Sequence, residues 1–398
     1  MSLRGSTALL LTLTLPRHLS TTAAFFCYYA SLVHQQNMLQ DLVRTGAYHG
    51  AIMANAADFR GKVVVDVGTG SGVLAYFAVR AGARHVYALE ASGVAQRARK
   101  LLEANGLGDR ITVMQAKVEE AELPERADVI VSEPMGFMLI HERMLESYII
   151  ARQRFLKPGG LMFPSRGTIH CAPFSDPALH AEQCEKVAFW RTTDFFGLDL
   201  SPLLEDARRD HFGQPVVGFV DPTTLLSPLT ATGTIDFGAD APAALERIAI
   251  PFSFTAARTA LCHGLAAWFD VTFAGSSEEI HLRTGPHAPG THWYQVRILL
   301  RDPLAVNAGQ RLQGSLVCTA NARYSYDCTL TMALAGSEGS TGDGKPIVCE
   351  GQCSLADQMY SYGASATAAG AGGEAAPAAA QPQQPQQKQQ QQQQRGSH

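Results

Sequence analysis

Residues 62–72 read K-V-V-V-D-V-G-T-G-S-G, and this stretch decides the fold class. A short β-branched run leads into a glycine-rich turn, and residues 73–80 continue with apolar side chains at helical spacing. A second apolar run, residues 84–90, ends on Glu90, 22 residues after Gly68. An acid at this place in a βαβ unit can accept hydrogen bonds from two ribose hydroxyls. The pattern predicts a nucleotide-type cofactor, and it fits NAD as well as S-adenosylmethionine.

Two acids further along the chain distinguish these cofactors. Residues 132–148 read S-E-P-M-G-F-M-L-I-H-E-R-M-L-E-S-Y, with Glu133 and Glu142 at the two ends of an apolar loop. The strand expected over 127–132 delivers Glu133 to the carboxyl edge of the sheet, where ligands of open α/β sheets bind. Two such carboxylates suit a guanidinium, which is planar and always protonated. Methyl transfer onto arginine needs such a pair and hydride transfer does not, so the loop favours S-adenosylmethionine.

Four motifs in this order resemble the protein arginine N-methyltransferases. Besides the glycine turn and the double-glutamate loop, they are H-Q-Q-N-M-L-Q-D-L-V-R-T-G-A-Y at 34–48 and T-H-W-Y-Q at 291–295. Pro134 stands where several classes of the family have tryptophan, so the chain most resembles the coactivator-associated, fourth class. The likeness extends from about residue 25 to residue 334.

The resemblance implies an α/β Rossmann-like S-adenosylmethionine-dependent methyltransferase domain followed by an antiparallel β-barrel domain with a helical dimerisation arm. Periodicity agrees, because segments such as 248–254 alternate in polarity as strands do. Apolar residues from Phe25 to Val43 recur at helical spacing and predict one amphipathic helix. The expected divisions are an extension at 1–24, a cofactor domain at 25–163, a barrel domain at 164–335 with its arm at about 176–212, and a disordered Gly/Ala/Gln-rich tail at 336–398.

The resemblance also assigns roles to individual residues. It places Glu133 and Glu142 on the substrate guanidinium and pairs His292 with Asp41 as proton acceptor. Met38 and Met144 would crowd the substrate nitrogen and favour asymmetric over symmetric dimethylation. The residues expected to bind the cofactor are Phe26, Tyr29, Gln35, Arg44, Gly68, Glu90, Glu119 and Ser147. Among them, Phe26 and Tyr29 would cover the sulfonium, and Arg44 would hold the methionine carboxylate.

Composition adds few constraints. The 398 residues are 46% hydrophobic with a net charge of −4, so there is a full core and no polybasic footprint for nucleic acid. Eight cysteines lack metal-ligand spacing, which predicts reduced thiols and no metal. The first 40 residues hold no acid and include an apolar run at 8–15, which is too short to span a bilayer. Residues 1–24 are therefore either a targeting segment or a poorly defined start of the chain.

The expected activity is transfer of methyl groups to arginine in proteins, giving monomethyl and asymmetric dimethylarginine, with a role in chromatin and transcription. By resemblance, the substrates are histone H3 and RNA-binding or transcription proteins, the assembly is a homodimer, and the location is nucleus and cytoplasm, without direct binding to nucleic acid or membrane. Two alternatives from other classes remain, a dinucleotide oxidoreductase and a catalytically impaired scaffold.

Overall fold

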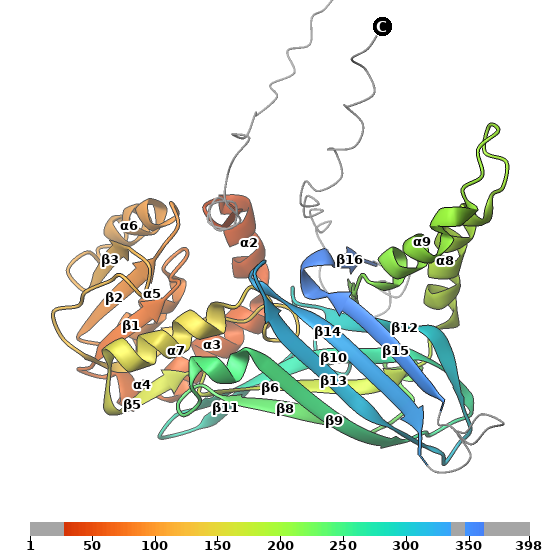
Figure 1. Cartoon of the computed structure of the whole chain (residues 1–398). Helices are drawn as coiled ribbons and strands as arrows, with labels where there is room; N and C mark the ends of the chain where they lie inside the picture. Colours follow the sequence, from red (N-terminus) through yellow and green to blue (C-terminus); the bar gives the residue numbers. More distant parts are fainter. Residues whose placement is uncertain (1–27, 336–346, 362–398) are drawn as a thin grey trace, which may run out of the picture. The chain divides into compact units, whose positions relative to one another are not determined.

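The computed structural model describes residues 28–335 and 347–361 (Figure 1). The expectations for residues 1–24 and for Phe26 lie outside this range. No helix within the described residues is long and apolar enough to cross a bilayer. Those residues also contain no group of three or more His, Cys, Asp or Glu side chains placed to hold a metal ion. The seven described cysteines are free thiols.

The N-terminal half is a five-stranded parallel sheet in the order β3-β2-β1-β4-β5. Strand β1 is V-V-V-D-V and is buried throughout, as expected for a parallel strand covered by helices on both faces. The strand order reverses between β1 and β4, which makes the carboxyl ends of these strands the place for a ligand. The strands are β1 Val63–Val67, β2 His85–Glu90, β3 Ile111–Gln115, β4 Ala127–Ser132 and β5 Leu156–Phe163.

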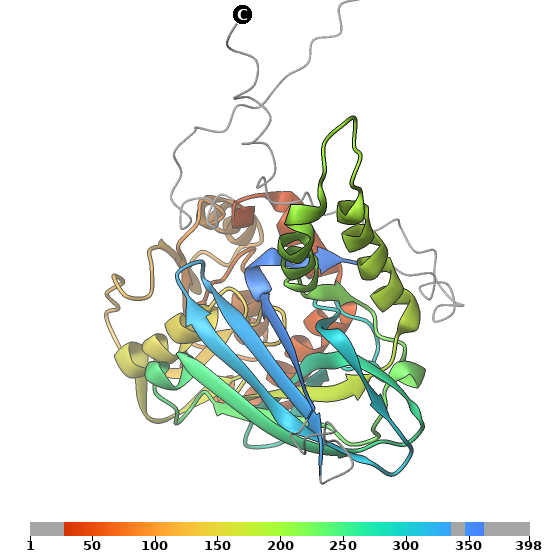
Figure 2. The same cartoon turned by 45° about the vertical axis from the view of Figure 1, so that its right-hand side comes forward.

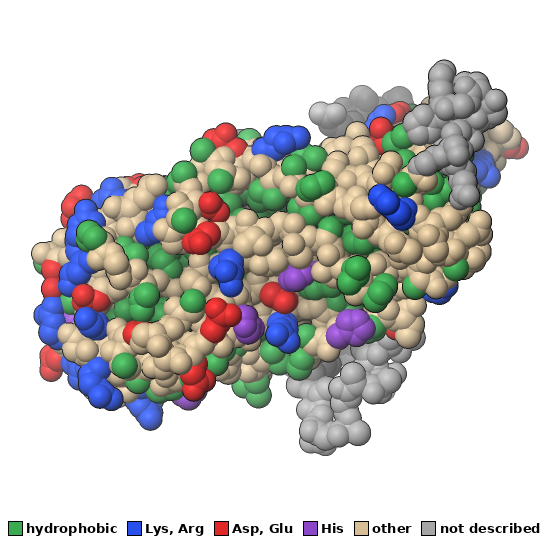
Figure 3. All heavy atoms as spheres, turned by 90° about the horizontal axis from the view of Figure 1, so that it is seen from below, with side chains coloured by type: hydrophobic (Ala, Val, Ile, Leu, Met, Phe, Trp, Pro, Cys, Tyr) green, Lys and Arg blue, Asp and Glu red, His purple; other side chains and the backbone are tan. Residues whose placement is uncertain are grey.

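Helices surround this sheet, and they are α3 Leu42–Ala54, α4 Ala56–Phe59, α5 Val73–Arg80, α6 Ala95–Ala104 and α7 Met144–Phe155. On the face shown in Figure 3, acidic and basic side chains are intermingled and are densest over this half of the molecule. That face therefore presents no extended field of one sign.

The prediction of a single amphipathic helix over residues 25–43 is wrong in one respect. The described part is two helices, α2 Leu32–Gln40 and α3, separated at Asp41. The Asp41 carboxylate accepts a hydrogen bond from the backbone N–H of Arg44 and caps α3. Periodicity cannot reveal this break, because the apolar spacing continues through it. The break frees the Asp41 side chain to reach the barrel.

The C-terminal half, predicted to be an antiparallel β-barrel, is built from two largely antiparallel sheets. One has the order β16-β7-β12-β10-β6-β8 with β11 added to β10, and the other has the order β15-β14-β13-β9. Strand β9 is buried at every second residue, as its alternating sequence predicts. The strands are β6 Arg166–Phe174, β7 Val216–Gly218, β8 Ala231–Asp236, β9 Arg247–Thr255, β10 Ala260–Ala274, β11 Glu279–Arg283, β12 Gln295–Val306, β13 Arg311–Asn321, β14 Ser325–Leu334, β15 Val348–Ser354 and β16 Met359–Tyr360.

The tail expected to be disordered from residue 336 needs a correction for residues 347–361. Strand β15 pairs with β14 and buries Cys349, Gly351 and Cys353 at alternate positions. The sequence gives only a weak strand signal here, because glycine and cysteine replace the usual β-branched residues. Strand β16 adds in parallel to β7, and the Tyr360 ring lies 6.2 Å from that of Phe137 in the double-glutamate loop.

The segment at about 176–212 forms a pair of helices, α8 Pro177–Ala188 and α9 Leu204–Phe212. Figures 1 and 2 show the two helices side by side, with the loop between them extending past both. Proline at the first position and Asp176 as N-cap start α8. The loop exposes large apolar side chains, and Phe196 is 98% exposed. An exposed aromatic tip of this kind marks an interaction surface.

Candidate functional site

The glycine turn after β1 is held open by left-handed backbone angles. Gly68, Gly70 and Gly72 have φ of 68°, 54° and 88°, which side-chain-bearing residues rarely adopt. A Cβ on Gly68 would lie 2.2 Å from the Met144 Cε atom, and one on Gly70 would lie 2.7 Å from the Gln35 Oε1 atom. The positive φ values favour glycine at these positions, and a larger side chain would in addition displace the ends of the Met144 and Gln35 side chains. Both predicted neighbours of the site, Met144 and Gln35, lie directly against this turn.

Glu90 ends β2 beside the turn, as predicted. One of its oxygens accepts a hydrogen bond from the Gly70 N–H at 3.0 Å, and the other accepts one from the Ser92 N–H at 2.8 Å. Glu119 and Ser147 meet further along, where the Ser147 hydroxyl donates to the Glu119 Oε1 atom at 2.9 Å. These predicted cofactor residues thus lie at the end of β2, after β3 and in the first turn of α7.

Asp66 is a candidate site residue that sequence reasoning missed. It is fully buried on β1, and its Oδ2 atom accepts hydrogen bonds from the Thr69 hydroxyl at 2.5 Å and the Ala75 N–H at 3.0 Å. Its Oδ1 atom has no hydrogen-bond partner among the described residues. Burial raises the pKa of Asp66 to about 7, and the charge of Glu90 adds to this shift. A charged residue inside a β-branched run was the signal that could have identified it.

The double-glutamate loop has a constrained backbone. Met138, Leu139, Glu142 and Arg143 all have φ between 53° and 73°. Non-glycine residues in this region cost about 1–3 kcal/mol each when the conformation is strained, and they cluster at functional sites. The loop is anchored to the barrel, since the Arg143 Nη1 atom donates to the Asn321 carbonyl at 3.0 Å. Glu142 therefore has little freedom to move away from its observed position.

Glu133 is bound to the guanidinium of Arg44. The Nε and Nη2 atoms of Arg44 donate to the Glu133 Oε2 atom at 3.1 and 3.0 Å, and the two side chains are only 7% and 8% exposed. The Arg44 Nη1 atom donates to the Met38 carbonyl at 3.2 Å. In this chain the Glu133 carboxylate thus already binds a guanidinium in a desolvated setting, where charge-assisted bonds are strong.

Glu142 is bound to Tyr29. The Tyr29 hydroxyl lies 2.8 and 2.7 Å from the two oxygens of the Glu142 carboxylate. Burial raises the pKa of Glu142 to about 7; the Tyr29 hydroxyl opposes this shift and the charge of Glu133 adds to it. Burial and Glu142 together raise the pKa of Tyr29 well above its ordinary value. The Glu133 charge therefore disfavours ionisation of Glu142, and a cation bound at the two carboxylates would relieve this repulsion.

The predicted pair of His292 and Asp41 is present. The Asp41 Oδ2 atom lies 2.7 Å from the His292 Nδ1 atom and accepts a hydrogen bond from the His292 N–H at 2.9 Å. Burial alone would raise the pKa of Asp41, but the hydrogen bonds from His292 and from the Arg44 N–H hold it below its ordinary value. A carboxylate on Nδ1 orients the imidazole and leaves its Nε2 atom available to a substrate. Asp41 thus connects the helix break to the barrel loop.

Comparison with known proteins agrees with this geometry. Residues 64–160 match a family model described as a methyltransferase domain, and residues 165–337 match one described as the arginine methyltransferase oligomerization subdomain. The structure of the Trypanosoma brucei PRMT1 enzyme-prozyme complex with AdoHcy is 31% identical in sequence, with a TM-score of 0.73, and the match covers 82% of this chain and 99% of that one. The chain belongs to the protein arginine methyltransferase family.

Other members of this family show the same relationship. The structure of Arabidopsis thaliana protein arginine methyltransferase 10 is 30% identical, with a TM-score of 0.75, and the match covers 83% of this chain and 99% of that one. The probable histone-arginine methyltransferase CARM1 of Oryza sativa subsp. indica is 54% identical over 315 residues, which are 79% of this chain and 60% of that protein. The histone-arginine methyltransferase CARMER of Drosophila yakuba is 48% identical over 318 residues, 80% of this chain and 60% of that protein.

The chain therefore spans about 60% of the length of these two relatives. Membership of the arginine methyltransferase family confirms the predicted Rossmann-like domain and barrel, and it leaves no support for a dinucleotide oxidoreductase.

Proposed function

We propose that this protein transfers methyl groups from S-adenosylmethionine to the guanidinium nitrogens of arginine in proteins. The observation that supports this most directly is the bond between Glu133 and Arg44, because a carboxylate that accepts hydrogen bonds from one guanidinium in a desolvated setting is suited to the guanidinium of a substrate. A second carboxylate, that of Glu142, lies close enough to interact with it electrostatically. Two acids at a sheet edge beside a glycine turn fit a cationic substrate next to a cofactor.

The residues around the turn fit S-adenosylmethionine. Glu90 is placed for the ribose, and the unpartnered Asp66 Oδ1 atom suits the ammonium of the methionine portion. Arg44 would hold the methionine carboxylate. The cofactor supplies an electrophilic methyl group on a sulfonium. Gly68, Gln35, Tyr29, Glu119 and Ser147, with Phe26 outside the described residues, complete the proposed binding set.

The two glutamates would orient the substrate and stabilise its charge. A guanidinium is a poor nucleophile because its lone pairs are delocalised, so one terminal nitrogen must be aimed while positive charge is held on the remainder. Carboxylates fixed in advance can do both, and alignment of the reacting atoms lowers the barrier further. His292, oriented by Asp41 at 2.7 Å, would accept the proton that is released.

The expected products are monomethyl and asymmetric dimethylarginine. Met144 lies against Gly68, and Met38 belongs to the helix that precedes the break at Asp41. Thioether side chains on both sides of the guanidinium would limit the room for a second methyl group. The nitrogen that already carries one methyl would then accept the next.

The proposed substrates are histone H3 and RNA-binding or transcription proteins, with action in the nucleus and cytoplasm and a role in chromatin and transcription. The relatives from rice and Drosophila are named as histone-arginine methyltransferases, which supports a histone substrate. We also propose a homodimer formed through the exposed tip of the arm, which lies inside the residues matched by the oligomerization model.

A methylation assay with the whole chain tests this function. Purified protein, S-adenosylmethionine and either histone H3 or an RNA-binding protein would be incubated, and the products identified by mass spectrometry. Methylarginine formed by the wild type and absent with Glu133→Gln supports the proposal. Cofactor binding without any methylarginine on either substrate would instead support an impaired scaffold.

A further inference from the structure

Helix α3 contacts the double-glutamate loop through two side chains one turn apart. Arg44 binds the Glu133 side chain, and Tyr48, four residues later, reaches the main chain beside it. The Tyr48 hydroxyl donates to the Ser132 carbonyl at 2.8 Å, and both residues are fully buried. This carbonyl belongs to the planar peptide that joins Ser132 to Glu133. The hydrogen bond therefore sets the direction in which the chain enters Glu133.

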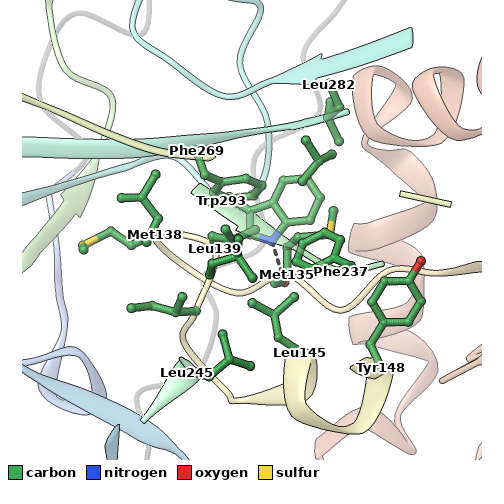
Figure 4. Close-up of a cluster of buried hydrophobic side chains, with 14 of the residues drawn as sticks. Met135, Met138, Leu139, Leu145, Tyr148, Phe237, Leu245, Phe269, Leu282 and Trp293 are labelled. Carbon is green, nitrogen blue, oxygen red and sulfur yellow. Dashed lines mark hydrogen bonds between the residues drawn. The ribbon is translucent and has the colours of Figure 1, made fainter. Parts of the chain in front are cut away.

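The chain is held on the other side of Glu133 as well. The indole N–H of Trp293 donates to the Met135 carbonyl at 3.0 Å, shown as the dashed line in Figure 4. Between these two fixed carbonyls stands Pro134, whose ring restricts φ. The Met135 N–H in turn donates to the Glu133 Oε1 atom at 3.3 Å. A displacement of the Ser132 peptide would thus move the Glu133 carboxylate.

The effect of the Tyr48 hydroxyl can be tested separately from the packing of the Tyr48 ring. The ring meets Phe273 edge to face, with centroids 4.8 Å apart, and lies beneath the Arg44 guanidinium at 5.9 Å. Phenylalanine would preserve both contacts. Its only loss would be the hydroxyl, which contacts the Ser132 carbonyl and, at 3.6 Å, the Met135 sulfur atom.

We propose that the Tyr48 hydroxyl is a positioning group for Glu133, which it holds in place through the Ser132 peptide while Trp293 holds the peptide after Met135. This inference rests on the proposed function, because Glu133 matters as the carboxylate that aims the substrate guanidinium. Tyr48 touches neither substrate nor cofactor in this scheme and acts only through the backbone.

The test compares Tyr48→Phe with a matched control. Tyr326 is also buried, and its hydroxyl donates to the backbone carbonyl of Leu245 at 2.8 Å, inside the barrel. Tyr326→Phe therefore removes the same chemical group and the same kind of bond without a contact to the Ser132–Glu133 peptide. Both variants should lose thermal stability to a similar degree. Only Tyr48→Phe should lower kcat, by about tenfold or more, with KM for S-adenosylmethionine within about twofold of wild type.

Amide hydrogen exchange gives a second readout that does not depend on activity. Without the Tyr48 hydroxyl, the Met135 amide should exchange about tenfold faster, whereas Tyr326→Phe should leave it unchanged. Unchanged exchange in Tyr48→Phe would overturn the proposal, and so would a kcat equal to that of Tyr326→Phe. If the wild type transfers no methyl group to arginine, the proposed function fails, and the exchange rates alone decide whether Tyr48 positions Glu133.

Discussion

At the scale of single residues, the site consists of buried acidic side chains that are stabilised by their hydrogen-bond partners. Glu133 and Glu142 repel each other, and each has a donor from the N-terminal helical segment, Arg44 for one and Tyr29 for the other. Asp66 and Glu90 are two further buried acids, and the charge of Glu90 acts on Asp66. Because buried charges are costly without partners, this arrangement is suited to binding cations. The first three predictions concern Glu133, Glu142 and Glu90.

Replacing either glutamate by its amide should nearly abolish methyl transfer and leave cofactor binding largely intact. Glu133→Gln and Glu142→Gln keep the shape of the side chain but remove the charge that stabilises the guanidinium. Loss of such a fixed partner costs about 3 kcal/mol or more in the barrier, which is more than a hundredfold in rate. Glu122→Gln, at a carboxylate that is 92% exposed, is the control. Turnover within threefold of wild type for either glutamate variant would refute the assignment.

Glu90→Ala should weaken S-adenosylmethionine binding by about 1.5–3 kcal/mol, the usual range for a hydrogen bond to a charged group. Calorimetry measures this directly. The carboxylate also accepts hydrogen bonds from the Gly70 and Ser92 N–H groups, so Glu90→Gln, which keeps one acceptor oxygen for them, separates cofactor contact from support of the turn. Affinity unchanged in both variants would mean that the ribose is held elsewhere.

The raised pKa of Glu142 predicts a pH-dependent difference in stability. The folded chain holds this proton up to about pH 7, whereas the unfolded chain releases it near the ordinary value of 4.5. Folding therefore takes up a proton between these values, and the contribution of Glu142 to stability falls as pH rises. Glu142→Gln should become more stable than wild type by up to about 3 kcal/mol between pH 5 and pH 8. A difference in unfolding free energy that does not vary with pH would contradict the prediction.

At the scale of elements, two features decide which residues meet. The break between α2 and α3 turns the Asp41 carboxylate toward His292, and the loop between α8 and α9 presents aromatic side chains to solvent. The first is stabilised by contact with the barrel, and the second, we propose, by contact with a second copy of the chain.

The exposed arm predicts a dimer that can be disrupted without unfolding the protein. Phe196→Glu together with Leu198→Glu should give a monomer by sedimentation velocity and should lower activity, because the arm would bury these side chains against a partner. The monomer should keep its own fold, since the two side chains are 98% and 61% exposed. Leu229→Glu is the control, because Leu229 is equally apolar, 72% exposed and outside the arm. Full activity in a verified monomer would contradict this prediction.

At the scale of the whole molecule, the site is assembled from three regions distant in sequence. The helical N-terminal segment supplies Asp41 and Arg44, the sheet edge supplies Glu133, and the barrel loop supplies His292. The Trp293 indole ties this barrel loop to the double-glutamate loop, in the apolar cluster of Figure 4. Product chemistry depends on the space that these regions leave between them.

The product should be monomethyl and asymmetric dimethylarginine. Met38 and Met144 would restrict the pocket so that a second methyl group reaches only the nitrogen that already carries the first. Acid hydrolysis of a methylated substrate followed by mass spectrometry distinguishes the isomers, and purified standards of both dimethylarginines provide the control. Symmetric dimethylarginine as the main product would contradict the pocket argument and leave the assignment of Glu133 and Glu142 intact.

The sequence alone determined the features that depend on neighbours in the chain. The β-branched run, the glycine turn and the acid at Glu90 specify a Rossmann-like half. Each of these signals is a pattern within a short window of the sequence. Alternation predicted the barrel strand at 248–254 in the same way. The double-glutamate motif likewise identified Glu133 and Glu142, since both acids lie on one loop after one strand.

Only the tertiary structure decided the features that depend on distant contacts. The N-terminal helix is broken at Asp41. The Asp41 carboxylate caps α3 and binds His292, and these two contacts stabilise the chain more than a continuous helix would. The tertiary structure ordered residues 347–361, because an edge strand of low propensity is stabilised by pairing with β14. It also paired Glu133 with Arg44, a bond across 89 residues that no spacing rule predicts. The attraction between two buried opposite charges offsets their desolvation cost only where the fold brings them together.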